Sequence, residues 1–584
     1  MAGLLALLAA RLQPAFDGVA PGADPVLRPS SQAGVDFQAN GALPLAKRLG
    51  RPAAEVAAEI VASADLGDVC AKVEASAKGF INLTLADEWL AGTLAAVAAD
   101  PRLGRSTAGR PLTVVVDYSA PNVAKEMHAG HVRTTIIGDA LCRLLGDAGH
   151  RVIRENHVGD WGTQFGMLIE YLVDAGEAGG EELSVGDLDG FYRQARAAFD
   201  GSEEFRERSR RRVVALQSGD PETMRLWHQL VDQSMAYFAA VYRRLGVLLQ
   251  PEDVVGESFY NDLLPGVVAD LEAKGLLVES EGARCVFPAG FTNREGDPLP
   301  LIVQKSDGGY NYATTDLAAL RDRFGRLGAD RALYVVGAPQ ALHFEMVFAV
   351  GRAAGWVPAG KEPVHVAFGS MLGTDRKMFR TRAGDTVKLA ELVDEAVQRA
   401  AAAVAAKNPE LPADEARLVA EDVGIGALKY ADLSTDRTRD YVFDWDRMLA
   451  FEGNTAPYLQ YAHARIRSIF RRAGRDADGV LASAGAMAAG GALGLAEPEE
   501  RALAVAVLGF DTAVAATLEG YSPHKLCSYL FDLAGTFTAF YERCPVLRVD
   551  DPALRESRLL LSACAAAVLE SGLGLLGIAA PSRM

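Results

Sequence analysis

The chain has 584 residues, a length that at about 150 residues per domain predicts three or four domains instead of one core. Apolar residues make up 49% and charged residues 23%, which is ordinary for a folded soluble protein and argues against long disordered tracts. The formal net charge of -17 argues against general nucleic-acid binding, so any contact with a polyanion must come from local basic patches.

The six cysteines are scattered without a CxxC pair, so neither a disulfide framework nor a zinc module is expected. No positive charge precedes the apolar run 4–10, which argues against a secretory signal. The uncharged stretch 479–496 is too rich in glycine and alanine to enter a membrane, and we expect a loop there. These features predict a cytoplasmic chain with no membrane partner.

Residues 1–105 are predicted to form a small α/β domain. It has an amphipathic opening helix, an alanine-rich helical stretch at 52–63 and a strand at 80–85. The polar and glycine-bearing segment 100–110 is typical of a linker.

A second domain is expected over 106–445. The β-branched run 112–118 predicts a strand buried on both faces, and a helical period follows from Met127 to Gly149. Further strands at 151–156, 332–336 and 364–368 alternate with helical segments, which predicts a doubly wound, Rossmann-like parallel sheet. In such a sheet, ligands bind at the carboxyl ends of the strands.

Two further regions are expected to be helical. A charge-rich insertion lies near 185–260, and its arginines between 206 and 212 are typical of a solvated helix face. Residues 446–584 follow a helical period with few β-branched runs, which predicts an all-α C-terminal domain.

The segment 117–131, DYSAPNVAKEMHAGH, joins the first strand of the second domain to its helix. A helix N-terminus with unpaired N–H groups favours phosphate, and His128 and His131 are placed to donate hydrogen bonds to it. Gly130 has no side chain, which leaves room for a flat adenine against the backbone. About 245 residues later, the loop 375–385 carries Lys377 and Arg380, cations suited to a departing pyrophosphate.

These two motifs resemble the signatures of the class I aminoacyl-tRNA synthetases. Residues 128–131 are similar to the HIGH motif and 377–381 to the KMSKS loop. Four longer segments resemble the arginyl-tRNA synthetases, and they lie at 119–125, 157–166, 312–318 and 454–465. The resemblance implies a two-step reaction: L-arginine and ATP, with Mg²⁺, give arginyl-adenylate and pyrophosphate, and the arginyl group then passes to the terminal adenosine of tRNA(Arg).

The resemblance also implies an arginine pocket. A guanidinium is planar, permanently charged and rich in donors, so it needs carboxylates, for which Asp117 and Asp316 are the candidates, with Tyr312 beside them. For Asp316 a helix cap is the alternative role. By similarity to the family, Asn122 and Gln340 hold the amino and carboxylate groups, and His131 lies near both substrates.

The catalytic assignments follow from the same resemblance. His128, His131, Lys125, Lys377 and Arg380 are expected to stabilise charge on the leaving pyrophosphate, and His128, Gly130, His131 and Lys377 to contact ATP. The chain has Arg380 followed by Thr381 where many relatives have a second lysine, and Lys125 is expected to compensate. No tightly bound, protein-ligated metal is expected.

The flanking domains are expected to contact tRNA. By resemblance, the N-terminal domain touches the tRNA elbow, and the C-terminal helical domain binds the anticodon. The first contributes Phe37, Gln38, Asn40 and Asn82, and the second Tyr458, Tyr461 and Arg465. Packing is the alternative role for Phe37 and for either tyrosine. The chain is expected to act as a monomer.

The sequence argues against three other functions. A cysteinyl relative would need a thiol pocket and the zinc cluster that this sequence lacks, and a catalytically dead tRNA-binding protein would not need both histidines, Lys377 and both aspartates. A dinucleotide-dependent dehydrogenase is excluded because the first strand–helix turn carries no GxGxxG.

Overall fold

A computed structural model describes residues 3–30, 32, 34–177, 188–379, 387–489 and 493–584. The chain divides into two compact units. One contains Met1–Thr107, Ala400–Tyr430 and Arg447–Met584, and the other contains Ala108–Arg399 and Ala431–Asp446. Residues 400–430, expected in the second domain, thus group with the C-terminal helices.

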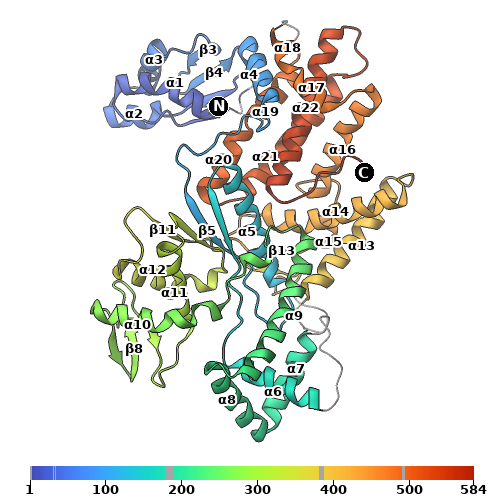
Figure 1. Cartoon of the computed structure of the whole chain (residues 1–584). Helices are drawn as coiled ribbons and strands as arrows, with labels where there is room; N and C mark the ends of the chain where they lie inside the picture. The colour runs from blue at the N-terminus through green and yellow to red at the C-terminus, as the bar shows by residue number, and fades with distance from the viewer. Residues whose placement is uncertain (1–2, 31, 33, 178–187, 380–386, 490–492) are drawn as a thin grey trace. The chain divides into compact units, whose positions relative to one another are not determined.

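The second unit is built on a four-stranded parallel sheet, as the sequence predicted (Figure 1). Its order is β11 (Glu362–His365), β10 (Arg331–Tyr334), β5 (Thr113–Asp117) and β6 (Arg151–Glu155). The register pairs Asp117 with both Glu155 and Tyr334, and Tyr334 with His365. The last residues of all four strands therefore meet at one edge.

Helices cover this sheet because its strands are apolar on both faces. Val114, Val115 and Val116 are fully buried. Helix α5 (Gly130–Asp147) contacts β5 and β6, and a Cβ at Gly138 would lie 2.3 Å from the Tyr118 Cβ. Only glycine lets the helix lie so close to the chain that leaves β5.

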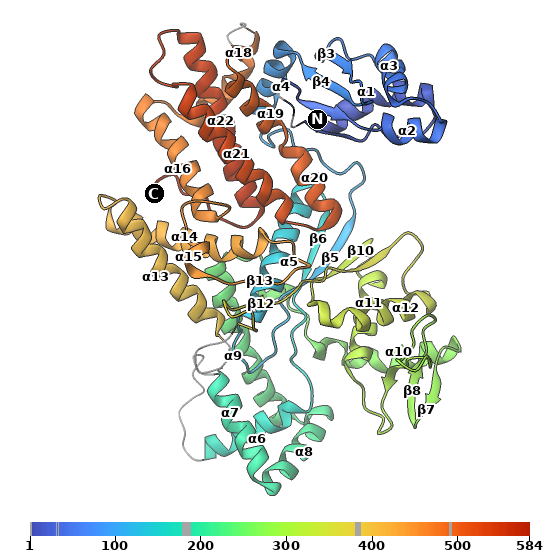
Figure 2. The same cartoon turned by 180° about the vertical axis from the view of Figure 1, so that it is seen from behind.

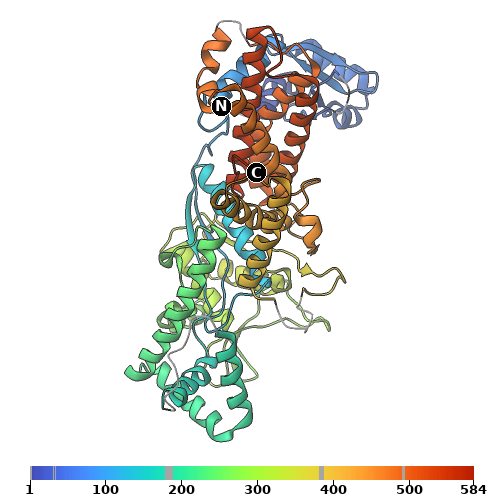
Figure 3. The same cartoon turned by 90° about the vertical axis from the view of Figure 1, so that its right-hand side faces the viewer.

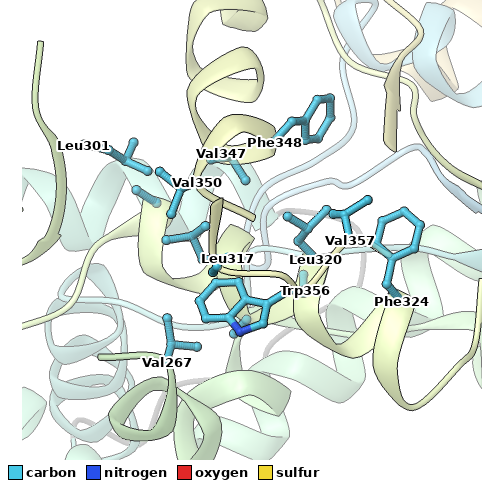
Figure 4. Packing of buried hydrophobic residues seen from close by; sticks show 14 of the residues in the cluster. Val267, Leu301, Leu317, Leu320, Phe324, Val347, Phe348, Val350, Trp356 and Val357 are labelled. Atoms are coloured by element: carbon cyan, nitrogen blue, oxygen red, sulfur yellow. The ribbon is translucent and has the colours of Figure 1, made fainter. Parts of the chain in front are cut away.

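A large hydrophobic cluster fixes the helices α10 (Leu264–Ala273), α11 (Tyr312–Gly325) and α12 (Ala341–Ala353). Figure 4 shows Leu317 and Leu320 of α11 beside Trp356, with Val347 and Val350 of α12 nearby. The Trp356 indole N–H donates to the Asp270 carboxylate of α10. This cluster holds α11 rigidly over the sheet edge.

The predicted helical insertion contains α6 (Gln164–Glu177), α7 (Leu188–Gly201), α8 (Glu203–Gln217) and α9 (Pro221–Leu245), drawn in teal and green in Figure 3. Arg208 bonds both oxygens of Asp174 at 2.8 and 2.7 Å, and Arg212 bonds Glu170 at 2.9 Å. These arginines are therefore paired with carboxylates of α6.

Smaller elements complete this unit. They are the short helices η1 (Pro251–Asp253), η2 (Glu257–Leu263) and η3 (Ala338–Gln340). The strands are the antiparallel β7 (Val278–Ser280), β8 (Ala283–Val286) and β9 (Leu301–Gln304) and the pair β12 (Met371–Leu372) and β13 (Tyr441–Val442). The unit also contains much of α13 (Leu389–Lys407) and the start of α15 (Trp445–Met448).

The N-terminal part of the first unit is an α/β fold, as expected. Its antiparallel sheet has the order β1-β2-β4-β3. The strands are β1 (Leu27–Pro29), β2 (Phe37–Ala39), β3 (Cys70–Ala75) and β4 (Ile81–Leu85), and the helices are α1 (Leu4–Val19), α2 (Ala42–Leu49), α3 (Ala53–Ser63) and α4 (Asp87–Ala99).

The C-terminal part of this unit is helical, also as expected (Figure 2). Its helices are α14 (Ala413–Leu433), α16 (Ala456–Ala473), α17 (Ala477–Ala482), α18 (Ala484–Ala489), α19 (Pro498–Leu508), α20 (Phe510–Gly520), α21 (His524–Arg543) and α22 (Pro552–Leu575). The loop predicted at 479–496 is wrong in part, because α17 and α18 occupy most of it and alanine favours helix.

Two segments, Pro498–Gly520 and Pro552–Leu575, have the length and hydropathy of a membrane span. The second is 78% buried in its apolar window and is a core helix of this unit.

Candidate active site

The carboxyl ends of β5 and β6 carry a buried ion triad. The Arg323 guanidinium on α11 donates to Asp117 at 2.8 Å and to Glu155 at 2.7 Å, and it lies 4.5 Å from the Tyr334 ring centroid. Only 1% of the Arg323 side chain and 10% of the Asp117 side chain are exposed. The Asp117 carboxylate, expected to face a substrate, therefore has one oxygen engaged by the protein itself.

The segment after β5 is held in a strained conformation. Ser119, Ala120 and Ala124 have φ values of 75°, 48° and 60°, in the left-handed region that costs about 1–3 kcal/mol for a residue with a side chain. The Ala120 N–H donates to Asn156 at 3.0 Å, and the Ala124 N–H to Ser234 at 2.9 Å. Partners from α9 and from the residue that follows β6 thus fix this turn.

Asn122 is exposed on that turn, as its proposed contact with substrate requires. A Cβ on Gly159 would lie 2.2 Å from the Asn122 Oδ1, and the Gly159 N–H donates to the Pro121 carbonyl at 3.1 Å. Gly159, in the segment 157–166, therefore makes room for the amide of Asn122.

His128 and His131 lie together at the start of α5, with their ring centroids 4.0 Å apart. The His131 Nδ1 accepts from the His128 backbone N–H at 3.1 Å, and the His128 Nδ1 accepts from the Gly130 N–H at 3.0 Å. Burial and the neighbouring His128 lower the pKa of His131 to about 3, and burial also lowers the pKa of His128. Both rings are therefore neutral at pH 7, and each offers one donor, its Nε2–H.

Gly130 has a different role in this structure from the one expected. A Cβ there would lie 2.7 Å from the Cε1 and 2.9 Å from the Nδ1 of His128. The absent side chain makes room for the imidazole, so the space next to this residue is not free for adenine.

Of the three expected cations, the structure describes Lys125 and Lys377. Lys125 is half-buried, with its ammonium 4.3 Å from the Tyr192 ring centroid. Lys377 is exposed in a tight turn, where its carbonyl accepts from the Gly373 N–H at 2.8 Å. Arg380 lies outside the described residues.

From residue 387 the described chain lies against the histidine motif. The Ala129 N–H donates to the Val387 carbonyl at 2.8 Å, and Lys388 pairs with Glu126 at 3.0 Å. One end of the basic loop is thereby anchored beside His128.

Asp316 lies in the second turn of α11 and is half-buried. The Asn311 side chain caps the helix by accepting from the Ala313 N–H at 3.1 Å, so the alternative of Asp316 as a cap is wrong. The Asp316 carboxylate instead forms a 2.6 Å hydrogen bond with His343 Nε2 on α12. Tyr312 is 67% exposed, and its ring centroid lies 4.9 Å from that of His343.

Gln340 is exposed at the end of η3, directly before α12. Its chain is held to the sheet because the Ala338 N–H donates to the Phe368 carbonyl at 2.8 Å. Gln340 and His343 thus begin the helix that faces Asp316.

A third acidic group, Glu257, was not found from the sequence. Burial, together with the charges of Asp160 and Asp316, raises its pKa from 4.5 to about 7. Asp160 is also buried, and its carboxylate accepts from the Ser258 hydroxyl and N–H at 2.6 and 2.8 Å. Asp160 lies in the segment 157–166 that resembles the arginyl-tRNA synthetases, and this resemblance is the one sequence signal that could have marked it as a site residue. Glu257 had none.

The N-terminal candidates for tRNA contact are placed unequally. Phe37 is 3% exposed and Asn40 is 8% exposed, so the Phe37 ring packs in the core and presents no stacking face. Gln38 donates to Asn82 across neighbouring strands at 3.0 Å, and both are half-buried.

The C-terminal candidates lie on α16. The Arg465 guanidinium is 4.4 Å from the Tyr541 ring centroid, and Lys407 is 5.1 Å from that of Tyr461. Tyr461 and Arg465 line a cavity of about 380 Å³ together with Arg471 and Arg583. Tyr458 is half-buried against Phe531, with ring centroids 5.6 Å apart.

No group of three or more His, Cys, Asp or Glu side chains suited to hold a metal ion occurs among the residues that the structure describes.

Comparison with known proteins matches all three regions. A family model described as "tRNA synthetases class I (R), catalytic domain" matches residues 93–445. Models described as "Arginyl tRNA synthetase N terminal domain" and "DALR anticodon binding domain" match 4–85 and 459–584. An arginine–tRNA ligase of Thermobifida fusca is 53% identical over 590 residues, and the match covers 100% of both chains. The chain belongs to the arginyl-tRNA synthetase family.

Other members of that family support the assignment. An arginine–tRNA ligase of Erwinia tasmaniensis is 49% identical over 99% of each chain. The crystal structure of the arginyl-tRNA synthetase of Plasmodium falciparum has a TM-score of 0.84 at 28% identity, and that of Thermus thermophilus has 0.80 at 26%. Both cover 100% of either chain. The family resemblance and the fold expected from the sequence are confirmed.

Proposed function

We propose that the chain ligates L-arginine to tRNA(Arg) in the two steps of its family, using the edge of the parallel sheet as its active site. The observation that carries the proposal is a set of carboxylates at the carboxyl ends of the parallel strands. Burial raises the pKa of Tyr334 and of Glu257; the charges of Asp117 and Asp316 act in the same direction on Tyr334, and that of Asp316 on Glu257. This edge of the sheet is therefore built for a cation.

The two ends of the pocket suit different groups of arginine. Arg323 binds one oxygen of Asp117 and returns a positive charge to this buried inner end, which therefore suits the single ammonium group of the substrate. Asp316 lies farther out, next to the exposed ring of Tyr312 and to Glu257, and it fits the guanidinium. This division refines the expectation that both aspartates bind the guanidinium.

Asn122 and Gln340 complete the arginine site. Both are exposed at the same sheet edge, on the turns that follow β5 and β10. Their amides hold the amino and carboxylate groups and direct the carboxylate towards ATP.

In the first step an oxygen of the arginine carboxylate attacks the α-phosphorus of ATP. A new P–O bond forms, and the bond to pyrophosphate breaks with its electron pair. His128 and His131 each donate a neutral Nε2–H to the phosphate oxygens, while Lys125, Lys377 and Arg380 supply positive charge. Mg²⁺ enters with ATP as part of the substrate and neutralises phosphate charge.

In the second step a ribose hydroxyl of the terminal adenosine, the 2′-hydroxyl by class I resemblance, attacks the activated carbonyl and AMP leaves. No side chain of the site is assigned as general base, so positioning carries this step.

The first unit contributes the tRNA contacts. The cationic cavity at Tyr461 and Arg465 has the ring and the charges that an unstacked anticodon base and its phosphate need, and Tyr458 lies on the same helix. In the N-terminal part, Gln38 and Asn82 present amides, whereas Phe37 and Asn40 support the fold from inside. We further propose a monomeric, cytoplasmic enzyme with the expected boundaries near 105 and 445.

The test is pyrophosphate exchange measured with each amino acid, with and without tRNA. Exchange is expected with arginine, and exchange with cysteine or glutamate but not with arginine would overturn the assignment.

Asp316→Asn keeps the shape of the side chain and removes its charge. It is expected to raise the KM for arginine about 10- to 100-fold with little change for ATP, since a charged hydrogen bond contributes about 1.5–3 kcal/mol. Asp307→Asn, in an exposed turn, is the matched control. Equal changes in both KM values would mean that Asp316 only shapes the fold.

A further inference from the structure

Arg323 places a guanidinium of the protein inside a pocket that accepts a guanidinium. Its side chain is 1% exposed and bridges two carboxylates on neighbouring strands at 2.7 and 2.8 Å. We infer that Arg323 is a positioning residue that fixes the direction in which arginine enters, by occupying Asp117 and Glu155 so that the substrate's guanidinium binds only at Asp316. This inference rests on the proposed function.

The residues on one face of α11 show why the orientation of arginine has to be fixed. Tyr312, Asp316 and Arg323 are spaced by four and seven residues, so they lie on one side of the helix. Along the axis, seven residues correspond to about 10 Å. Acidic groups therefore lie at both ends of the same stripe, and without Arg323 the two ends would compete for the same forked cation.

The charge balance favours an arginine whose ammonium lies at the inner end, beside Asp117, and whose guanidinium lies at Asp316. Asp117 and Glu155 carry two negative charges, and Arg323 returns one, so the inner end keeps one net negative charge. The remaining acceptor of Asp117 suits one ammonium group. An arginine bound the wrong way round would place its carboxylate beside Asp316 and Glu257, away from the histidine turn.

Arg323 is also held against movement. The guanidinium lies 4.5 Å from the Tyr334 ring centroid, and Leu320 and Phe324 on either side of it in the sequence are core residues of the α11 cluster (Figure 4). A side chain so fixed presents Asp117 in one rotamer, which is what a positioning residue has to do.

The experiment compares Arg323→Gln and Arg323→Lys with Arg326→Gln as control. Arg326 is the C-cap residue of the same helix and pairs with Asp322 at 2.7 Å, but 57% of its side chain is exposed. Pyrophosphate exchange gives KM for arginine and ATP separately, and circular dichroism reports folding. Arg323→Gln is expected to raise the KM for arginine about 10- to 100-fold, with KM for ATP within about 2-fold, whereas the control leaves both unchanged.

Chemical rescue separates positioning from a structural role. Millimolar guanidinium ion is expected to restore part of the exchange rate of Arg323→Gln by filling the vacated place between Asp117 and Glu155, and methylammonium is not. In the wild type, guanidinium competes with arginine at Asp316 and only inhibits. Absence of rescue, or parallel losses in arginine and ATP binding, would overturn the inference.

Arg323→Lys covers the case in which the glutamine variant fails to fold. Lysine keeps the charge but cannot fork between two carboxylates, so it is expected to fold and still to raise the KM for arginine. An unchanged KM would overturn the inference. A wild-type enzyme that fails to exchange pyrophosphate with arginine would instead overturn the proposed function.

Discussion

The raised pKa of Glu257 predicts how arginine binding depends on pH. Burial and the charges of Asp160 and Asp316 raise this pKa from 4.5 to about 7 in the free protein. A guanidinium beside these groups favours the ionised carboxylate, so arginine binding releases a proton below pH 7. The KM for arginine is therefore expected to fall as pH rises, by up to about tenfold per pH unit below 7, and to level off above it.

The assay is the KM for arginine in pyrophosphate exchange between pH 5.5 and 8.5, for the wild type and for Glu257→Gln. His131 does not disturb the comparison, because its pKa of about 3 keeps it neutral throughout. The glutamine variant removes the carboxylate with little change of shape. Its profile is expected to be flatter, with a KM about tenfold higher than that of the wild type at pH 8.

Titrations of ATP or of the arginine amino group affect both proteins alike, so the ratio of the two KM values isolates Glu257. A ratio that stays constant across the range would refute the assignment of Glu257 to the arginine pocket.

The same shift has a consequence for stability, with a fixed sign. A carboxylate whose folded pKa is raised resists ionisation in the native state, so the free energy of unfolding falls as pH rises from about 4.5 to about 7. Glu257→Gln is therefore expected to raise the unfolding midpoint in urea at pH 8 and to leave it unchanged near pH 4. A loss of stability at pH 8 would contradict the direction of this pKa shift.

Three further substitutions test other parts of the structure. Gly130→Ala crowds His128 and is expected to lower kcat about 10²-fold, as loss of one transition-state donor does; a rise in the KM for ATP alone would instead favour contact with adenine. Asp432→Asn leaves the buried Arg133, now 3.0 Å from that carboxylate, without its counter-ion, and is expected to cost about 3–5 kcal/mol in urea unfolding. Tyr461→Ala is expected to raise the KM for tRNA with arginine activation in saturating tRNA unchanged, and an unchanged KM for tRNA would place this ring in the fold alone.

Features local in the chain could be predicted from the sequence. The β-branched run ending at Asp117 and the helical period after Met127 gave a buried strand and α5, because each pattern is set by residues a few positions apart. The placement of His128 and His131 at the helix start followed from the same reasoning. The neutral state of these two histidines could not be predicted from the sequence, since it depends on burial and on two backbone donors.

Features set by distant residues could not be predicted. Asp117 and Arg323 are 206 positions apart, and no spacing in the sequence marks them as partners. The burial of Phe37 could not be predicted for the same reason. An aromatic residue on a strand faces either the core or the solvent, and which of the two it faces depends on how the whole sheet packs. The alternative role of Asp316 as a helix cap is wrong because Asn311, an equally good cap residue, comes first in the chain.

We propose that the distribution of charge in the pocket selects arginine among the amino acids. A neutral side chain in place of arginine would leave Asp316 and Glu257 close together without a cation, and such sites reject substrates that lack the expected donors. Lysine carries the charge, so it must be excluded by geometry: its ammonium is a point donor that neither forks between two carboxylates nor stacks flat on the exposed ring of Tyr312. We therefore expect the outer end of α11 to discriminate against lysine, and the acidic groups around it to discriminate against neutral residues.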